Sequence, residues 1–374
     1  MLHSTKSSSV SAFPHRRKTG TGPIPLTLFS APADREASSP IPTSGPTTDS
    51  DVKPAAELTG IARLAASSPL ARQKADTDYF LLPVRSILNE CNSPRMPFRW
   101  TVNPYRGCEF GCKYCYARYT HEYMELDGSD FERKIFVKQH AGELVERDLA
   151  TKEIWGEHIA IGTATDPYQP AEKEHGATRA ILERMAVREG LALSITTKSD
   201  RIVRDIDLLR TIASRSALFV NMTIITLRNG LARALEPRAP RPDLRLRAVR
   251  ALRDAGIAVG VHIMPVLPGI NDRESELDAL AAAAKEAGAQ WLAVGVLFLM
   301  PSSHKQFLPF IEKRFPRRAK QYQEWYGRAA YAPEAYRKEI ADRARNLREK
   351  NGLASRPVVE ATGRKFEQIS LALS

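Results

Sequence analysis

The feature that most constrains this chain is the regular alternation of apolar runs and amphipathic stretches between residues 143 and 298. The apolar runs 158–164, 191–197, 218–225, 257–265 and 291–298 predict strands, and the segments 143–154, 176–188, 205–215, 243–255 and 274–287 predict helices. Nearly continuous apolar strands separated by helices are typical of a parallel sheet covered by helices. Asp205 is a candidate N-cap, and Gly256 and Gly288 are candidate residues just beyond helix C-termini.

A further short strand at 100–102 would give six βα units, fewer than the eight of a closed TIM barrel. We therefore expect an α/β fold, a partial (β/α)6 TIM-type barrel with parallel strands, at 76–304. The pattern alone does not separate it from an open doubly wound sheet. Residues 1–75, rich in Ser, Thr, Pro and Ala, predict a disordered N-terminal leader. Residues 305–374 predict a C-terminal helical extension, with helices at 307–328 and 333–350 beside the barrel or across its open side.

The net charge of +12 lies at the two ends of the chain. Residues 1–75 carry +4, residues 76–304 are balanced, and residues 305–374 carry +8. A basic end can meet nucleic acid or another polyanion, or it can be a solvated face. In the C-terminal segment, basic and aromatic side chains alternate, which suits either nucleic-acid contact or an amphipathic helix with its aromatic residues turned inward: Phe315, Arg317, Arg318, Lys320, Tyr322, Trp325 and Tyr326.

Membrane insertion and secretion are not predicted. No apolar run approaches the roughly 20 residues that a spanning helix needs, and no apolar h-region follows the basic residues near the N-terminus. Three of the four cysteines are clustered, which argues against a disulfide framework and favours the reducing cytoplasm.

The chemistry is predicted to lie in the segment NPYRGCEFGCKYCY at 103–116, where Cys108, Cys112 and Cys115 have the spacing Cys-x3-Cys-x2-Cys. Thiolates are the usual ligands of iron–sulfur clusters, and a cubane normally takes four. Three thiolates on one loop would leave the fourth iron open to a substrate that chelates through an amine and a carboxylate. Gly107 and Gly111 let the backbone wrap closely around such a cluster.

Other interpretations of the cysteines stay open. A zinc ion could be held by the three thiolates with His121 or His140, although zinc sites usually repeat Cys-x2-Cys pairs. Cys91 lies upstream in a polar stretch and is a bystander, a regulatory thiol or a catalytic thiol.

With Tyr114 in the aromatic slot, the cysteine loop resembles the signature of the radical S-adenosylmethionine (SAM) superfamily. Over about residues 80–300 the chain resembles the spore photoproduct lyase-like branch of that superfamily. The motifs that carry the resemblance are GTATDPYQPAE (162–172), TTKS (196–199), RD (204–205), LEP (235–237), RL (245–246) and PVLPGIND (265–272).

The resemblance implies a [4Fe–4S] cluster on Cys108, Cys112 and Cys115, SAM as the second cofactor, and a one-electron donor such as flavodoxin or ferredoxin. Reductive cleavage of SAM would give a 5′-deoxyadenosyl radical for hydrogen abstraction. The implied SAM-binding residues are Tyr114, chiefly through its backbone, and Thr165, Asp166, Lys198 and Glu236. Three of these residues have a simpler explanation too: Lys198 could be a solvated lysine, and Asp166 and Glu236 could be turn residues of their Asp-Pro and Glu-Pro pairs. His262, inside an apolar strand, is predicted to be a core or pocket histidine.

The substrate is not predicted by the sequence. In photoproduct lyases a cysteine near SAM returns a hydrogen atom to the product radical, and Thr163 takes that place here. Repair chemistry would then need Cys91 or a tyrosine such as Tyr168. The candidates for substrate are a nucleic acid, a peptide or a small metabolite. The alternative function is a non-enzymatic zinc or iron–sulfur protein that binds nucleic acid.

Overall fold

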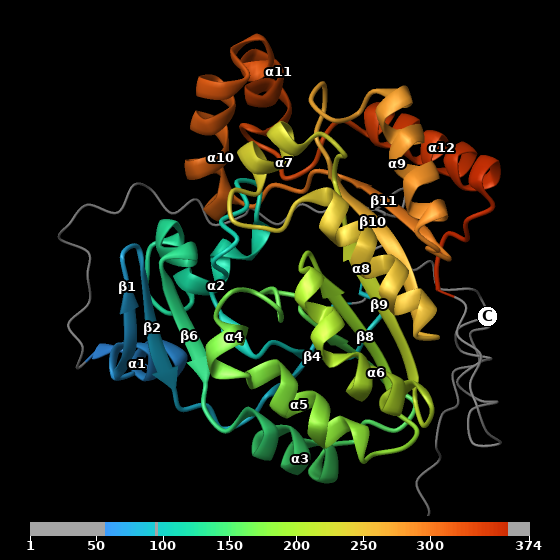
Figure 1. Ribbon diagram of the computed structural model, residues 1–374. Coiled ribbons are helices and arrows are strands. Elements are labelled where there is room, and N and C mark those ends of the chain that lie inside the picture. Colours follow the sequence, from blue (N-terminus) through green and yellow to red (C-terminus); the bar gives the residue numbers. More distant parts are fainter. Residues whose placement is uncertain (1–56, 94–95, 358–374) are drawn as a thin grey trace, which may run out of the picture.

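The structure is a computed structural model that describes residues 57–93 and 96–357, with a seven-stranded sheet at its centre (Figure 1). In spatial order the strands are β11 (Leu292–Val296), β10 (Ala258–Val266), β9 (Ala217–Thr223), β8 (Ala192–Thr197), β7 (His158–Ile161), β4 (Trp100–Val102) and β3 (Leu88–Glu90). The six strands from β11 to β4 are parallel, and β3 pairs antiparallel with β4 at one edge. The prediction of six parallel strands is confirmed.

The helices identify the sheet as a partial barrel. They are α3 (Ala141–Thr151), α5 (Ala177–Ala186), α6 (Ile206–Ala213), α8 (Pro242–Asp254), α9 (Glu274–Glu286) and α12 (Glu334–Asn351). Neighbouring helices contact one another in series, α3 with α5 and α5 with α6, then α8 with α9 and α9 with α12, along one face of the sheet (Figure 1). A doubly wound sheet would carry helices on both faces. In the described part of the chain the two edge strands do not pair, so the barrel is open.

The sequence accounts for most of these elements. Strand β9, ALFVNMT, is buried at every position, as expected of a strand covered on both faces. Gly256 (φ 79°) and Gly288 (φ 93°) follow α8 and α9 in the left-handed conformation, as predicted. Asp205 precedes α6 but makes no capping hydrogen bond, so that prediction is wrong. Its carboxylate binds Arg179 and Arg204 instead, because two guanidinium groups attract it more strongly than one backbone N–H.

A second, four-stranded sheet was not predicted. Its order is β1 (Leu70–Lys74), β2 (Thr77–Leu82), β6 (Lys134–Lys138) and β5 (Tyr105–Arg106), with α1 (Gly60–Ala66) beside it. The predicted leader is therefore wrong for residues 57–75, while residues 1–56 lie outside the described residues. Strand β1 has no apolar pattern to reveal it. It is held by backbone pairing with β2 and by ion pairs from Arg72 and Lys74 to Glu174.

The C-terminal extension is helical, as predicted, but its first helix is divided. Helices α10 (Pro301–Arg314) and α11 (Pro316–Tyr326) meet at Phe315, whose φ of −133° is not helical and which precedes a proline. Helix α12 packs against β11 and α9, beside the barrel. Residues 358–374 lie outside the described residues.

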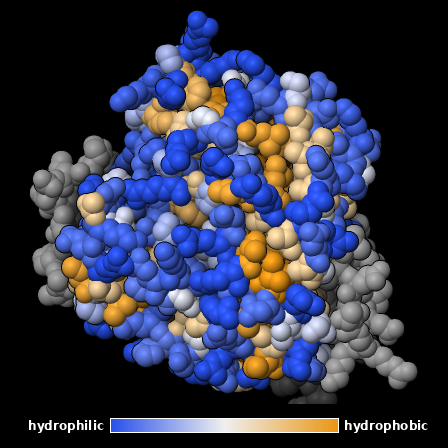
Figure 2. All heavy atoms as spheres, in the orientation of Figure 1, coloured by the Kyte–Doolittle hydropathy of each residue, from blue (hydrophilic) through white to orange (hydrophobic). Residues whose placement is uncertain are grey.

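Shorter segments complete the chain. They are α2 (Tyr119–Glu122), α4 (Glu172–His175), α7 (Asn229–Leu235), and the 3-10 turns η3 (Tyr116–Arg118), η4 (Gly128–Glu132) and η5 (Asp200–Asp205). The face of the molecule in Figure 2 is mostly hydrophilic, with apolar residues in small groups. None of the helices formed by the described residues combines the length and apolar character that crossing a bilayer requires.

Candidate active site

The three clustered cysteines lie on one loop at the carboxyl end of the barrel strands and line a single pocket. Cys108 and Cys112 are buried, Cys115 is half-buried, and none forms a disulfide. Gly107 has a φ of +84°, and a Cβ there would approach the carbonyl oxygens of Lys134 and Phe131 to 2.7 and 2.8 Å. Only glycine fits this close passage of the loop across β6. Gly111 is also left-handed, at φ +63°.

A buried glutamine, not predicted from the sequence, fastens this loop to the barrel. Gln169 Nε2 donates to the Gly107 carbonyl at 3.1 Å, and its Oε1 accepts from the Glu109 amide at 2.9 Å. Thr165 Oγ1 donates to the same carbonyl at 2.6 Å. Behind the loop, the fully buried Arg118 donates to the Cys112 carbonyl at 3.3 Å. The segment after β7 therefore holds the cysteine loop in place, and the position of Gln169 within GTATDPYQPAE was its only sequence signal.

The arrangement fits an iron–sulfur cubane better than a zinc site. Among the described residues, no three His, Cys, Asp or Glu side chains converge on a point that could hold one metal ion. A cubane has no such requirement, because each thiolate binds a different iron. The two histidines considered for zinc are used elsewhere. His121 Nε2 contacts the Lys134 carbonyl at 2.9 Å, and His140 is exposed at the start of α3.

The electrostatics of the thiols couple metal binding to the loss of their protons. Burial raises the pKa of all three thiols, that of Cys112 to about 12, with Lys198 opposing the rise at Cys112. Thiolates are the form that binds metal, and a buried thiolate is unfavourable without a compensating positive charge. A metal cluster supplies that charge, so ligation and deprotonation are coupled here.

Lys198 is the predicted SAM-binding residue with a free head group. It follows β8 and lines the pocket, and no hydrogen bond or ion pair of its Nζ occurs within residues 57–93 and 96–357. Nζ lies 6.0 Å from the centre of the Tyr114 ring. Burial lowers the pKa of Lys198, but the negative charges of Cys112, Glu236 and Asp166 outweigh it and raise the pKa. The side chain is therefore a cation beside the cysteine loop that can pair with a carboxylate.

Asp166 is already fully engaged with the protein. Its Oδ1 accepts from Thr197 Oγ1 at 2.7 Å and from the Tyr168 amide at 2.9 Å, and its Oδ2 accepts from the Lys198 amide at 2.7 Å. Burial raises the pKa of Asp166, and these hydrogen bonds oppose the rise. The carboxylate thus ties the ends of β7 and β8 together and sets the direction in which Lys198 leaves its strand.

Glu236 is brought close to the site but does not line the pocket. Its Oε2 lies 2.6 Å from Arg245 Nη2, in a pair whose side chains are 0% and 1% exposed, and its Oε1 accepts from the Tyr114 hydroxyl. Arg245 also donates to the carbonyls of Thr223 and Pro240. The chain Tyr114–Glu236–Arg245 therefore anchors the cysteine loop against β9. Arg245 stands in the RL motif, although no role was predicted for it from the sequence.

A second motif pair meets in the same way. Arg204 Nη2 lies 2.8 Å from Glu172 Oε1, which joins the last residue of GTATDPYQPAE to the RD motif. Arg228, which follows β9, does not line the pocket, and its Nη2 lies 3.1 Å from Glu276 Oε2. Several motifs that are separate in the sequence are thus paired parts of one scaffold.

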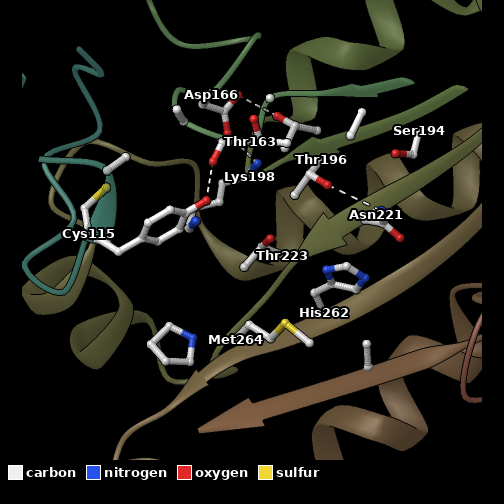
Figure 3. Close-up of a pocket in the computed structure, with 18 of the residues that line it drawn as sticks. Cys115, Thr163, Asp166, Ser194, Thr196, Lys198, Asn221, Thr223, His262 and Met264 are labelled. Carbon is white, nitrogen blue, oxygen red and sulfur yellow. Dashed lines mark hydrogen bonds between the residues drawn. The ribbon is translucent and has the colours of Figure 1, made fainter. Parts of the chain in front are cut away.

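The interior of the barrel below the cysteine loop carries a group of polar side chains, which Figure 3 shows, among largely apolar lining residues. Thr196, Asn221, Thr223 and His262 project into it from β8, β9 and β10, and Ser194 lies deeper. Burial and, to a smaller extent, the positive charge of Lys198 lower the pKa of His262 to about 4, so the imidazole is neutral at pH 7. The expectation of a pocket histidine is confirmed. Polar residues within otherwise apolar strands were the sequence signal for this surface.

An aromatic residue closes the lower end of this interior. Trp291 Nε1 donates to Asn221 Oδ1 at 3.1 Å, and a Cβ on Gly260 would lie 2.2 Å from the indole, which therefore covers that glycine. The pocket therefore extends from the cysteine loop to the indole of Trp291.

Candidates for hydrogen transfer are also placed by the structure. Thr163 lines the pocket, whereas neither Cys91 nor Tyr168 does. Tyr116 does line it, and its hydroxyl donates to the Thr163 carbonyl. Among the described residues, the cysteines that line this pocket are the three of the loop.

The aromatic residues of the C-terminal segment pack inward. Tyr322 and Tyr326 are buried and donate to the carbonyls of Pro268 (3.0 Å) and Leu297 (3.3 Å), and the rings of Trp325 and Tyr336 lie 5.1 Å apart. The amphipathic-helix interpretation is confirmed for these rings. The basic side chain of Lys320, 90% exposed, faces solvent.

Comparison with known proteins identifies the family of this chain. The radical SAM superfamily model matches residues 102–281. An uncharacterized protein of Mycobacterium tuberculosis is 35% identical over 272 residues, which span 72% of this chain and 80% of the relative. One from Methanocaldococcus jannaschii is 32% identical over 176 residues, spanning 47% of this chain and 63% of the relative. The partial barrel and its cysteine loop define the class, and the chain belongs to the radical SAM superfamily.

Among solved structures, spore photoproduct lyase complexed with dinucleoside spore photoproduct is similar in fold, with a TM-score of 0.56. The match covers 79% of this chain and 85% of that chain at 16% identity. At this identity the likeness shows a shared fold alone.

Proposed function

We propose that this protein is a radical SAM enzyme that uses a [4Fe–4S] cluster on Cys108, Cys112 and Cys115. When bound, the cluster and SAM supply reductive cleavage of SAM to methionine and a 5′-deoxyadenosyl radical, which abstracts a hydrogen atom from the substrate. The observation that supports this most is the free ammonium of Lys198 in the pocket that the three cysteines line.

The predicted SAM-binding residues divide into two roles, direct contact with SAM and positioning. Lys198 would pair with the carboxylate of SAM, and the backbone beside Tyr114 would meet its adenine. Asp166 and Glu236 would act by positioning, because their oxygens already accept hydrogen bonds from β8 and from Tyr114. Thr165 would hold the loop through Gly107.

The substrate would occupy the barrel interior. Thr196, Asn221, Thr223 and the neutral His262 offer hydrogen-bond donors and acceptors there to a polar group of the substrate. Nucleic acid, one of the candidate substrates, stays a proposal. Since Tyr322 and Tyr326 are buried, exposed cations such as Lys320 are left to contact its phosphates. A one-electron donor such as flavodoxin or ferredoxin would reduce the cluster, and a reducing cytoplasm is the setting that suits it.

The first experiment separates a cluster from zinc. Protein purified and reconstituted without oxygen should contain about four irons per chain, and the Cys108→Ala/Cys112→Ala/Cys115→Ala variant should contain almost none. A Cys91→Ala variant is the matched control and should keep its iron. Stoichiometric zinc in place of iron would contradict the proposal.

The second experiment separates an enzyme from a passive cluster protein. With dithionite and SAM, the reconstituted protein should release 5′-deoxyadenosine. Lys198→Met should raise the Kd for SAM roughly tenfold or more, since a hydrogen bond to a charged group is lost. Lys338→Met, at a side chain that is 79% exposed on α12, should leave it unchanged. Full iron content without any 5′-deoxyadenosine would favour the non-enzymatic alternative.

A further inference from the structure

A second pocket, away from the cysteine loop, is lined by basic residues. It lies between α1, the segment that joins β2 to β3, and the ends of β5 and β6 (Figure 1). Arg63, Arg85, Arg106 and Lys138 contribute to its lining, and no acidic residue does. The predicted function makes no use of this pocket.

Two of the four cations are largely buried and lack a counter-charge. Lys138 is only 5% exposed, and within residues 57–93 and 96–357 its Nζ makes no hydrogen bond or ion pair. Arg106 has a buried Nε without an acceptor, and its Nη1 reaches only the Thr120 carbonyl, at 3.4 Å. A buried charge without a partner is energetically unfavourable, so an anion bound beside Lys138 and Arg106 would stabilise them.

The protein itself does not provide that anion. The carboxylate that influences Lys138 is Asp148, and its Oδ2 accepts from Ser86 Oγ and from the amides of Ile87 and Leu88. Arg147 pairs with its Oδ1 at 3.5 Å. Burial and the charge of Arg106 together lower the pKa of Lys138 to about 7, because Asp148 opposes them only in part.

We propose that this pocket binds a phosphate group. The guanidinium groups of Arg63, Arg85 and Arg106 match the oxygens of a phosphate in forked pairs, and Lys138 adds a point charge at the base. A doubly charged phosphate can neutralise more than one cation, whereas a single carboxylate would leave most of the four positive charges uncompensated. The phosphate can come from a small phosphorylated molecule or from the backbone of a single-stranded nucleic acid.

Titration calorimetry on the full-length, cluster-loaded protein tests this with two probes, pyrophosphate and a single-stranded oligonucleotide. We expect saturable pyrophosphate binding whose Kd rises roughly tenfold or more in Lys138→Met and in Arg63→Gln, as for loss of one charge-assisted hydrogen bond. Arg215→Gln, an exposed arginine after α6, is the matched control and should leave the Kd unchanged.

Binding should also protonate Lys138 near pH 7, because an anion favours its charged form. Guanidinium groups do not titrate at this pH, and the lowered pKa of Asp148 keeps its carboxyl ionised, but pyrophosphate can itself release a proton on binding. The uptake by Lys138 is therefore the difference in protons exchanged between the native protein and Lys138→Met, and we expect the native protein to take up more. Buffers of different ionisation enthalpy reveal it. If Lys138→Met does not fold, Arg63→Gln and Arg85→Gln carry the affinity test.

Oligonucleotide binding that weakens in the same variants, without pyrophosphate binding, would assign the phosphate to a nucleic-acid backbone. Absence of saturable binding by both probes, or equal weakening in Arg215→Gln, would overturn the proposal. Neither outcome depends on SAM cleavage, so this test and that of the proposed function can fail separately.

Discussion

Replacing Arg245 by Met isolates the ion pair behind the cysteine loop. In the native chain, the Arg245 Nη2 and Glu236 Oε2 atoms lie 2.6 Å apart, and the two side chains are 1% and 0% exposed. Methionine fills a similar volume but leaves the Glu236 carboxylate buried without a cation. It also leaves the Thr223 and Pro240 carbonyls without their donors. Removal of one partner of a buried pair typically costs about 3–5 kcal/mol. We expect the free energy of unfolding to fall by that amount.

The measurement is urea unfolding of the cluster-free protein, with linear extrapolation to water. The double variant Glu236→Gln/Arg245→Met removes both charges, and we expect it to regain at least about 2 kcal/mol relative to the single variant. Arg345→Met breaks a solvent-exposed pair with Asp342 (2.8 Å) and should change stability by less than about 1 kcal/mol. A loss below 1 kcal/mol in Arg245→Met, or no recovery in the double variant, would refute the reasoning.

Two further predictions concern the loop and the pocket histidine. Gly107→Ala should destabilise the protein and lower its iron content more than Gly176→Ala does. Both glycines have a positive φ, but of the two only Gly107 has carbonyl oxygens within 3 Å of the added Cβ. Equal effects of the two substitutions would contradict this account. Burial lowers the pKa of His121, His158 and His262 to about 4, below the usual 6.5. Their contribution to stability is therefore present above pH 6.5 and is lost as the pH falls towards 4, by about 1.4 kcal/mol per pH unit for each histidine. His262→Gln should reduce the slope of unfolding free energy against pH by that amount between pH 6 and 5, and an unchanged slope would show that His262 is protonated when folded.

Local patterns in the sequence were sufficient to predict the six parallel strands and the helices between them, but not to separate a partial barrel from an open doubly wound sheet. A run such as that of β9 must be buried on both faces, and the helices between the strands show their apolar face every three to four residues. Strand β1 escaped prediction because its side chains, LARQK, are exposed or half-buried and it is held by backbone hydrogen bonds. Backbone pairing leaves little trace in residue type.

The three pocket cysteines and the pocket lysine could likewise be found from the sequence, because three cysteines within eight residues and a strand-end lysine are local features. The partner of Glu236 could not be found from the sequence, because Tyr114 lies 122 residues before it. The same holds for Gln169, which reaches back to Gly107 and Glu109.

The sequence by itself thus determined the alternation of strands and helices and the loop of three cysteines, since both are set by neighbours along the chain. Only the tertiary structure decided which polar residues line the pocket of the three cysteines and which hold the scaffold. It also gathered Arg63, Arg85, Arg106 and Lys138 into one pocket. The physical reason is that a charged side chain gains its role from burial and from the partners that folding brings to it, and neither can be read from residue type.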